Sequence, residues 1–274
     1  MKHYVLLTGG HSGLGLGVTK KLLKPDNKLG LIIRNESRKQ DFLPKLSDFA
    51  PELVDNIDFF FADLSDQEQV YTVGQEIAQK WERVDRLFNN AAIVGSSQSV
   101  SRHGNEMHLE INALAPIILT KELKPLLLKS ADAKVITTVT GGMAKRELDT
   151  DTFFKDDTSR TMRVYMQSKQ AILLLMNDFA TDESWQGVKF LSVDPGPNKT
   201  KMTQSGETPW IIRNVLSRFF NEPEVGTQRI FDAGYDERFS NANGVYITGD
   251  KITSLKHNLS SEDKEALLAT ISLN

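Results

Sequence analysis

Short apolar runs alternate with longer amphipathic stretches along most of the chain. The short runs are almost continuously apolar, which is typical of parallel strands that are buried on both faces. They cover residues 4–7, 29–33, 57–61, 86–88, 135–139, 188–193 and 245–247. The longer stretches have apolar residues at three- and four-residue steps, which predicts helices. The expected helices cover 18–23, 68–81, 111–128, 165–180 and 223–235.

This alternation predicts an α/β fold with a doubly wound, mostly parallel sheet of about seven strands and helices on both faces. No repeat, low-complexity tract or Pro/Gly-rich linker divides the 274 residues, so we expect one domain over 1–274. Two stretches, 143–164 and 199–221, interrupt the alternation. We expect both to be substrate-side loops, because ligands of such sheets bind beyond the carboxyl ends of the strands. An ordinary surface loop and an amphipathic helix packed on its own core remain the alternative.

Composition narrows the classes of function. With 33 Lys and Arg against 36 Asp and Glu, the chain has a net charge of −3 and so no net positive charge to attract nucleic acid, although a local basic patch would not show in this total. The absence of cysteine removes disulfides, thiolate nucleophiles and Cys-ligated metals, and the five histidines lack metal-ligand spacing, so we expect no metal. No apolar run approaches the roughly 20 residues of a membrane span. We therefore expect a cytoplasmic enzyme without a membrane span.

The first strand leads directly into a glycine-rich turn, Thr8-Gly9-Gly10-His11-Ser12-Gly13-Leu14-Gly15. Glycines allow a tight turn and let the backbone approach a pyrophosphate, which the following helix N-terminus attracts. The spacing is Gly9-x-x-x-Gly13-x-Gly15, and no Lys-Ser/Thr pair follows as it would in a P-loop. Its position favours dinucleotide binding over a merely flexible turn. We expect His11 to be a solvated loop residue, the alternative being a contact with a cofactor phosphate.

The end of the second strand indicates which dinucleotide is bound. Arg34 follows the strand directly, and the first acidic residue, Glu36, comes two positions later. An arginine here accommodates a 2′-phosphate, whereas an acidic residue would bind a ribose hydroxyl. Arg34 therefore favours NADP(H) over NAD(H), the alternative being a solvated arginine at a strand end.

Tyr165 and Lys169 lie four residues apart, on one face of an expected helix. A free phenol, with a pKa of about 10, is a poor base at neutral pH. A neighbouring ammonium group lowers that pKa and makes the phenol a usable general acid or base. Because such a spacing arises readily by chance, the surrounding motifs decide its meaning.

Those motifs follow one another in a characteristic order. They are the glycine turn, Asp63-Leu64, Asn89-Asn90-Ala91-Ala92, Asn112, the Tyr165/Lys169 pair and Asp194-Pro195-Gly196. Together they resemble the short-chain dehydrogenase/reductase family over nearly the whole chain. The long gap before Tyr165 is similar to its retinol-dehydrogenase-like and protochlorophyllide-reductase-like branch. The resemblance implies a Rossmann-type fold, a small-molecule substrate, and a homodimer or homotetramer.

The resemblance also implies a role for each matching residue. Tyr165 would transfer a proton to or from the substrate oxygen, and Lys169 would lower the pKa of Tyr165 and bind the nicotinamide ribose. Asn112 would position a water molecule in a proton relay. With Arg34 added from its own position, the expected cofactor-binding residues are Gly9, Ser12, Gly13, Leu14, Gly15, Arg34, Asp63, Leu64, Asn90, Ala91, Tyr165, Lys169, Pro195, Gly196, Asn198 and Thr200.

One departure concerns the serine that the family places after the fifth strand, where its hydroxyl binds the substrate oxygen. The stretch here reads Val139-Thr140-Gly141-Gly142. Alignment from the strand start puts Thr140 at the serine position, whereas alignment on Val139 puts Gly141 there. Thr140 would keep a hydroxyl, and losing it would cost about 10²–10³ in rate. We predict Thr140 as the catalytic hydroxyl, with Gly141 as the alternative.

We therefore expect an NADP(H)-dependent oxidoreductase that interconverts a carbonyl and an alcohol on a small, largely apolar molecule. The apolar expectation rests on the stretch 199–221, which carries seven apolar residues beyond its polar start. Two alternatives remain open. One is a C=C reductase of the same fold, and the other is an NADP(H)-binding sensor or scaffold whose catalysis is weakened by the missing serine.

Overall fold

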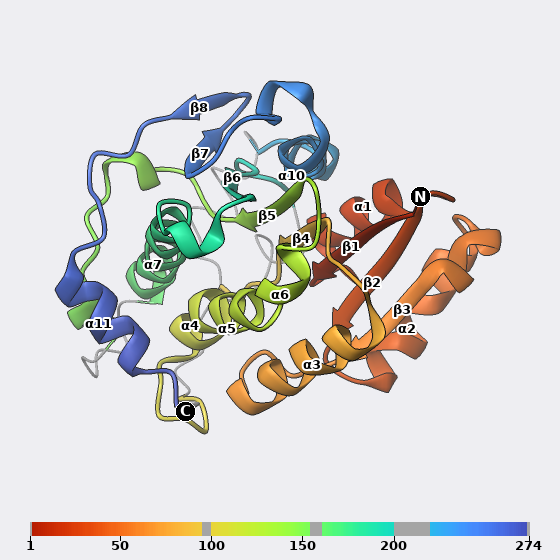
Figure 1. Cartoon of the computed structure of the whole chain (residues 1–274), viewed down its shortest axis with the longest axis horizontal. Helices are drawn as coiled ribbons and strands as arrows, with labels where there is room; N and C mark the ends of the chain where they lie inside the picture. Colours follow the sequence, from red (N-terminus) through yellow and green to blue (C-terminus); the bar gives the residue numbers. More distant parts are fainter. Residues whose placement is uncertain (1, 95–99, 154–160, 200–219, 273–274) are drawn as a thin grey trace.

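The computed structural model describes residues 2–94, 100–153, 161–199 and 220–272 (Figure 1). These residues form a single Rossmann-like domain around an eight-stranded sheet of order β3-β2-β1-β4-β5-β6-β7-β8. The strands are β1 (His3–Thr8), β2 (Asn27–Ile33), β3 (Ile57–Phe61), β4 (Arg86–Asn89), β5 (Ala133–Thr138), β6 (Val188–Asp194), β7 (Val245–Thr248) and β8 (Lys251–Thr253). All neighbouring pairs are parallel except β7 and β8. The mostly parallel α/β sheet is confirmed, and β8 is a short antiparallel edge strand that the apolar pattern did not predict.

Helices cover both faces of the sheet (Figure 1). On one face lie α1 (Gly13–Leu22), α2 (Glu36–Ser47) and α10 (Pro223–Tyr235), whose apolar side chains join one buried cluster. On the other face lie α3 (Gln67–Lys80), α5 (Ala115–Glu122) and α7 (Thr161–Phe179), which join a second buried cluster. The strand order reverses between β1 and β4. A crevice is therefore expected at the carboxyl ends of the strands on either side of this switch point.

The helix expected over 111–128 is divided into shorter pieces. The observed pieces are α4 (Met107–Leu109), a π-helical turn (Glu110–Leu114), α5 and α6 (Lys124–Leu127). Pro116 and Pro125 lie at the beginnings of α5 and α6. A proline has no N–H to donate to the carbonyl four residues earlier. The carbonyl of Asn112 consequently has no α-helical donor, and the chain adopts the π-turn at this point.

Two helices were not predicted, because their apolar periodicity is weak. Helix α2 buries only Phe42 and Leu46 and contains Pro44. Helix α11 (Ser261–Ala269) buries only Leu267. Both are polar on most of their surface, so the sequence pattern gave little sign of them.

The segment from β8 to the end of α11 runs beside α7 (Figure 1). It is attached by a hydrogen bond of 2.8 Å from the Lys256 N–H to the Ala144 carbonyl and by an ion pair of 2.7 Å between Lys264 and Asp178. Beyond α11, the Thr270 carbonyl accepts a hydrogen bond of 3.1 Å from Gln67 at the start of α3. This segment therefore connects the far edge of the sheet with the helical layer that contains α7. No helix within the described ranges is long and apolar enough to cross a membrane.

Candidate dinucleotide and active site

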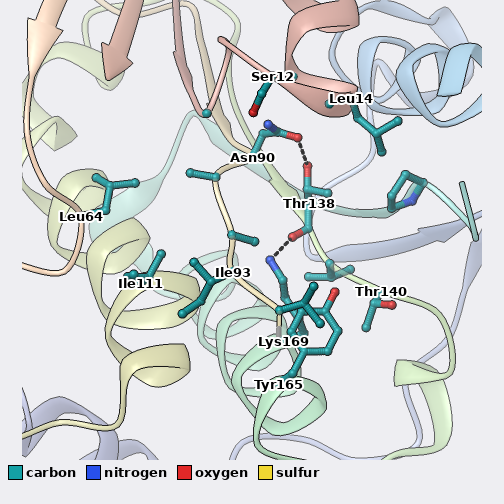
Figure 2. A pocket seen from close by; sticks show the side chains of 18 of the residues that line it. Ser12, Leu14, Leu64, Asn90, Ile93, Ile111, Thr138, Thr140, Tyr165 and Lys169 are labelled. Carbon is teal, nitrogen blue, oxygen red and sulfur yellow. Dashed lines mark hydrogen bonds between the residues drawn. The ribbon is translucent and has the colours of Figure 1, made fainter. Parts of the chain in front are cut away.

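A cavity of about 610 Å³ lies at the carboxyl ends of the parallel strands, beside the switch point (Figure 2). The sequence-predicted residues that line it are Gly9, Ser12, Gly13, Leu14, Gly15, Arg34, Asp63, Leu64, Asn90, Ala91, Thr140, Tyr165, Lys169, Pro195, Gly196 and Asn198. Asn112 lies behind the cavity wall, and Thr200 falls outside the described residues. The fold thus brings the segments that follow six strands, together with helix α7, to one site.

The glycine turn forms a backbone cradle at one end of this cavity. Gly9 has a φ of +68°, and a Cβ there would lie 2.9 Å from the Cα of Ala91. A Cβ on Gly15 would lie 2.1 Å from the Gly9 carbonyl oxygen, so no side chain fits. Ser12 is the N-cap residue of α1, yet its side chain makes no capping hydrogen bond. The Ser12 side chain therefore does not satisfy the N–H groups at the start of α1, which fits a phosphate group as their partner.

Two threonines that the sequence analysis missed connect the strand ends. The Thr8 hydroxyl accepts hydrogen bonds of 3.0 Å from the backbone N–H groups of both Asn90 and Ala91. The Thr138 hydroxyl donates to Asn90 Oδ1 at 3.4 Å, as drawn in Figure 2. Each is the last residue of its strand, but threonine is common in strands, so its position alone was a weak signal.

The end of β2 contributes charged groups to the cavity. Arg34 Nε pairs with Asp63 Oδ2 at 3.3 Å, and Asp63 Oδ1 accepts a hydrogen bond of 2.8 Å from the Ser65 hydroxyl. The prediction of a solvated His11 is wrong, because this side chain is partly buried and lines the cavity. Burial lowers the pKa of His11, and the positive charges of Arg38, Lys45 and Arg34 lower it further. Arg34, Arg38 and Lys45 therefore place positive charge near His11, and Asp63 offsets part of it through its ion pair with Arg34.

Lys169 is 3% exposed, and its Nζ donates a hydrogen bond of 2.8 Å to the Thr138 carbonyl (Figure 2). Burial lowers the pKa of Lys169 to about 7. Burial also raises the pKa of Tyr165, the neighbouring Thr140 side chain lowers it, and the charge of Asp194 raises it. We expected Lys169 to lower the pKa of Tyr165, but the net shift in the structure is upward. The cost of burying a phenolate outweighs the stabilising contacts.

The two candidates for the serine position have different neighbours in the structure. The Thr140 side chain lies beside the Tyr165 ring in Figure 2 and interacts with its hydroxyl. A Cβ on Gly141 would instead lie 3.1 Å from Asp194 Oδ2. The hydroxyl beside Tyr165 therefore belongs to Thr140, and a side chain at position 141 would crowd a buried carboxylate.

Asn112 is 1% exposed, and its side chain is occupied by protein partners. Its Oδ1 accepts a hydrogen bond of 2.8 Å from the Ile93 N–H, while Nδ2 donates to the Ile93 carbonyl and to Ser168 Oγ, both at 3.0 Å. The side chain thus connects the cavity wall at Ile93 to helix α7. The amide makes three bonds to protein groups, and the Asn112 backbone carbonyl has no α-helical donor, because residue 116 is a proline.

The turn after β6 is held by its own side chains. Gly196 has a φ of +78°, and its N–H donates to Asp194 Oδ1 at 2.8 Å. The Asn198 amide donates to the Pro195 and Gly196 carbonyls at 3.0 and 2.7 Å, and its Oδ1 accepts from the Gly226 N–H at 3.1 Å. Asn198 is 3% exposed and thereby fixes the turn against α10. Its contacts in the structure are those of a loop-shaping residue.

A Rossmann-like sheet with a glycine cradle and a Tyr–Lys pair at its switch point is typical of dinucleotide-binding oxidoreductases. The model of the family described as short chain dehydrogenase matches residues 3–209. The chain belongs to this family of oxidoreductases.

Relatives support the same placement. Human dehydrogenase/reductase SDR family member 12 is 29% identical over 193 residues, which are 70% of this chain and 59% of that protein. Human retinol dehydrogenase 14 is 25% identical over 239 residues, or 82% of this chain and 71% of that one. These matches confirm the resemblance to the retinol-dehydrogenase-like branch. The chain spans less than two thirds of the first of these relatives.

Solved structures share the fold at low sequence identity. The crystal structure of levodione reductase has a TM-score of 0.70 at 20% identity and covers 90% of this chain and 96% of its own. The NADPH-bound carbonyl reductase from chicken fatty liver has a TM-score of 0.67 at 18% identity. The match covers 92% of this chain and 100% of the carbonyl reductase chain. Likeness at this level of identity shows the fold alone.

Proposed function

We propose that the protein is an NADP(H)-dependent oxidoreductase that interconverts a carbonyl and an alcohol on a small, largely apolar molecule. The observation that carries the proposal is the convergence of Tyr165, Lys169 and the Thr140 side chain on a cavity with a glycine cradle. When bound, NADP(H) supplies or accepts the hydride. The residues of the chain bind and orient the substrate and move the proton.

Tyr165 would donate its proton to the carbonyl oxygen in reduction and accept a proton from the alcohol in oxidation. Its raised pKa keeps the phenol protonated at neutral pH, which suits the donating role. The Thr140 hydroxyl would hold the same substrate oxygen. Lys169, with a pKa of about 7, would gain positive charge beside an anionic cofactor, because that anion favours the ammonium form.

The preference for NADP(H) is supported by the positive charge at the end of β2. The Arg34 guanidinium lines the cavity, and the charges of Arg38 and Lys45 reach His11 in the same region. Among the solved neighbours, the carbonyl reductase is NADPH-bound and a 3-ketoacyl-(acyl-carrier-protein) reductase from Brucella melitensis is complexed with NADH. The neighbours therefore do not decide between the two cofactors, and Arg34 carries this part of the proposal.

An apolar substrate is supported by the cavity wall. The apolar residues that line the cavity include Ile93, Val139, Met162 and Phe220. The Lys169 ammonium group also lies at the cavity, but it is hydrogen-bonded to the Thr138 carbonyl. Met162 and Phe220 belong to the two stretches, 143–164 and 199–221, that we predicted to be substrate-side loops. Their presence at the cavity supports that prediction at the described ends of both stretches.

Cofactor choice is tested by titrating the protein with NADPH and NADH and following nicotinamide fluorescence. We expect NADPH to bind more tightly, and Arg34→Ala to weaken NADPH binding by about tenfold or more while leaving NADH binding nearly unchanged. Arg102→Ala is the matched control, because Arg102 is similarly exposed and pairs with Asp66 outside the cavity. Equal affinity of the wild type for NADH and NADPH would contradict the proposal that Arg34 selects NADP(H).

The chemistry is tested with a panel of apolar aldehydes and ketones. We expect Tyr165→Phe to lower kcat by about 10²–10⁴ and Thr140→Ala by about 10²–10³, with Thr140→Ser restoring most of the rate. Activity of Tyr165→Phe equal to wild type would exclude the mechanism. Turnover of an activated C=C bond alone would favour the C=C reductase, and NADPH binding without any turnover would favour a sensor or scaffold.

A further inference from the structure

The turn that presents Thr140 to Tyr165 contains two consecutive glycines. Thr140 lies two residues beyond the end of β5 and is followed by Gly141 and Gly142. Gly142 has a φ of +82°, and neither glycine has a side chain to restrict the backbone. The position of the Thr140 hydroxyl consequently depends on contacts from outside the turn.

Tyr246 on β7 supplies such a contact from behind the cavity. It is 2% exposed, and its hydroxyl donates a hydrogen bond of 3.0 Å to the Thr140 carbonyl. The backbone N–H of Met143 interacts with the same phenolic oxygen. One hydroxyl therefore contacts both ends of the four-residue turn 140–143, where a β-turn would form its own carbonyl-to-N–H bond.

The environment keeps this phenol in its donating form. Burial raises the pKa of Tyr246 to about 12, and the charge of Asp194 contributes to the increase. Tyr246 is therefore protonated at neutral pH and remains a donor to the Thr140 carbonyl. It is not among the described residues that line the cavity, so we expect it to act through the turn and not through the substrate.

We propose that Tyr246 is a positioning residue, whose hydroxyl holds the Thr140–Met143 turn so that the Thr140 side chain stays beside Tyr165. The inference rests on the proposed function, in which the Thr140 hydroxyl holds the substrate oxygen. A displacement of about 1 Å at such a contact can lower the rate by about 10²-fold. The Gly141–Gly142 backbone permits such a displacement once the hydroxyl of Tyr246 is removed.

The test is Tyr246→Phe, which removes one oxygen and keeps the ring. We expect kcat to fall by about 10- to 100-fold while KM for NADPH changes by less than about twofold, because the cofactor cradle is untouched. Tyr235→Phe is the matched control, since it removes the same oxygen from another tyrosine whose pKa burial raises to about 12, on α10. We expect Tyr235→Phe to keep the wild-type kcat. A wild-type kcat in Tyr246→Phe would overturn the proposal.

A double-mutant cycle shows whether Tyr246 acts through Thr140. On the Thr140→Ala background, Tyr246→Phe is expected to lower kcat by less than about threefold, because the group that it positions is already gone. Losses that multiply in the double variant would mean that Tyr246 acts independently of Thr140, and the proposal would fail.

Hydrogen exchange separates this inference from the proposed function. The backbone amides of Gly141, Gly142 and Met143 should exchange faster in Tyr246→Phe than in the wild type, whether or not a substrate is found. If these amides exchange faster in Tyr246→Phe but the wild type turns over no substrate, the proposed function is wrong and the contact between Tyr246 and the turn is confirmed. If amide exchange is the same in Tyr246→Phe and in the wild type, the contact between Tyr246 and the turn does not hold the turn, and the proposal fails.

If Tyr246→Phe does not fold, Gly142→Ala disturbs the same turn from its other side. Space is open around a Cβ at this position, so the substitution acts only through the strain of a φ of +82°. We expect a lower kcat with an unchanged KM for NADPH. A wild-type kcat would show that the rate does not depend on this turn.

Discussion

Lys169 is a buried titratable group of the candidate site. The residue is 3% exposed, and its ammonium group has a single hydrogen bond of 2.8 Å, to the Thr138 carbonyl, among those assigned in the described residues. The unfolded chain would bind a proton there up to a pH of about 10.4, whereas the folded protein releases it near pH 7. As the pH falls from about 10 to about 7, Lys169 becomes protonated in the unfolded state while it stays mostly neutral in the folded state. The residue therefore lowers the stability of the fold below pH 10, and this penalty is complete below about pH 7.

Lys169→Met tests this cost. The wild type should gain about 2 kcal/mol in the free energy of unfolding between pH 7 and pH 9 from this residue, and the variant should lack that gain. At pH 7 the variant should be more stable by about 1–3 kcal/mol, because the lost hydrogen bond to Thr138 offsets part of the benefit. Urea denaturation of the wild type and of Lys169→Met at pH 7 and pH 9 measures these free energies of unfolding. A pH dependence that is identical in the two proteins would contradict a buried, weakly basic Lys169.

Asp194 is a buried carboxylate that acts on Tyr165 through its charge. The groups that face it are Tyr165 on α7, Arg229 on α10, and Tyr246 and Thr248 on β7. Burial raises the pKa of Asp194, while the Gly196 N–H, the Thr248 hydroxyl and the charge of Arg229 oppose that increase. In its charged form it disfavours the Tyr165 phenolate, and so favours Tyr165 as a proton donor.

Asp194→Asn removes the charge and keeps an acceptor for the Gly196 N–H. The pKa of Tyr165 should fall, because the negative charge that raised it is gone. Alcohol oxidation needs the deprotonated phenol, so the acid limb of its pH–rate profile should move to lower pH. Glu262→Gln, which removes an exposed carboxylate on α11, is the control and should leave the profile unchanged. A shift of the limb to higher pH would contradict the electrostatic role.

At the scale of elements, the glycine turn and helix α1 act as one unit. Gly15 is buried against the Gly9 carbonyl, so the first turn of α1 packs directly on the strand end. The cradle thus depends on the close approach of two backbones. A single methyl group at position 15 would separate them.

Gly15→Ala should weaken NADPH binding by about tenfold or more, since its Cβ would lie 2.1 Å from the Gly9 oxygen and 2.7 Å from Asn90 Nδ2. Gly187→Ala is the control: its φ of +96° makes the substitution strained, but space is open around it. That control should lower stability by about 1 kcal/mol and leave the affinity for NADPH unchanged. Fluorescence titration and thermal unfolding measure both effects, and wild-type affinity in Gly15→Ala would contradict the described cradle.

The elements also show where apolar patterning stops being informative. The strands and the helices α3, α7 and α10 are close to their predicted ranges, because each buries a regular apolar face. The helix expected over 111–128 fails at Pro116 and Pro125, where the apolar pattern continues but the backbone hydrogen bonding cannot. Helices α2 and α11 bury too few residues to produce a clear period.

At the scale of the whole molecule, α11 completes the layer that contains α7. Leu267 has no exposed surface and belongs to the same buried cluster as Ile172 and Leu175 of α7. Helix α7 also carries Tyr165 and Lys169. The C-terminal segment therefore supports the helix that carries the Tyr165–Lys169 pair.

Leu267→Ala should lower the free energy of unfolding by about 2–5 kcal/mol, because it opens a cavity in the buried cluster. Leu128→Ala, at a leucine that is 45% exposed, should cost less than about 0.5 kcal/mol. Urea denaturation compares the two variants. Equal effects would mean that α11 does not pack on the core as described.

The fold class, the dinucleotide site and the family are indicated by the local spacing of residues along the sequence. Short apolar runs separated by three- and four-residue periodicity predict the α/β sheet, because each element must bury one face. The glycine turn and Arg34 indicate a dinucleotide site for a similar local reason, since they occupy the ends of the first two strands. The order of the motifs along the chain then indicates the family, which the family model confirms over residues 3–209.

Only the tertiary structure decides how the site residues face one another. It places the Thr140 side chain, and not position 141, beside Tyr165, and it occupies the Asn112 amide with Ile93 and Ser168. It also brings Tyr246 to the Thr140 carbonyl across 106 positions of sequence. The direction of the Tyr165 pKa shift likewise depends on burial by distant elements. Spacing along the chain encodes the local period of burial, whereas hydrogen-bond partners and desolvation arise from contacts that close only when the sheet is assembled.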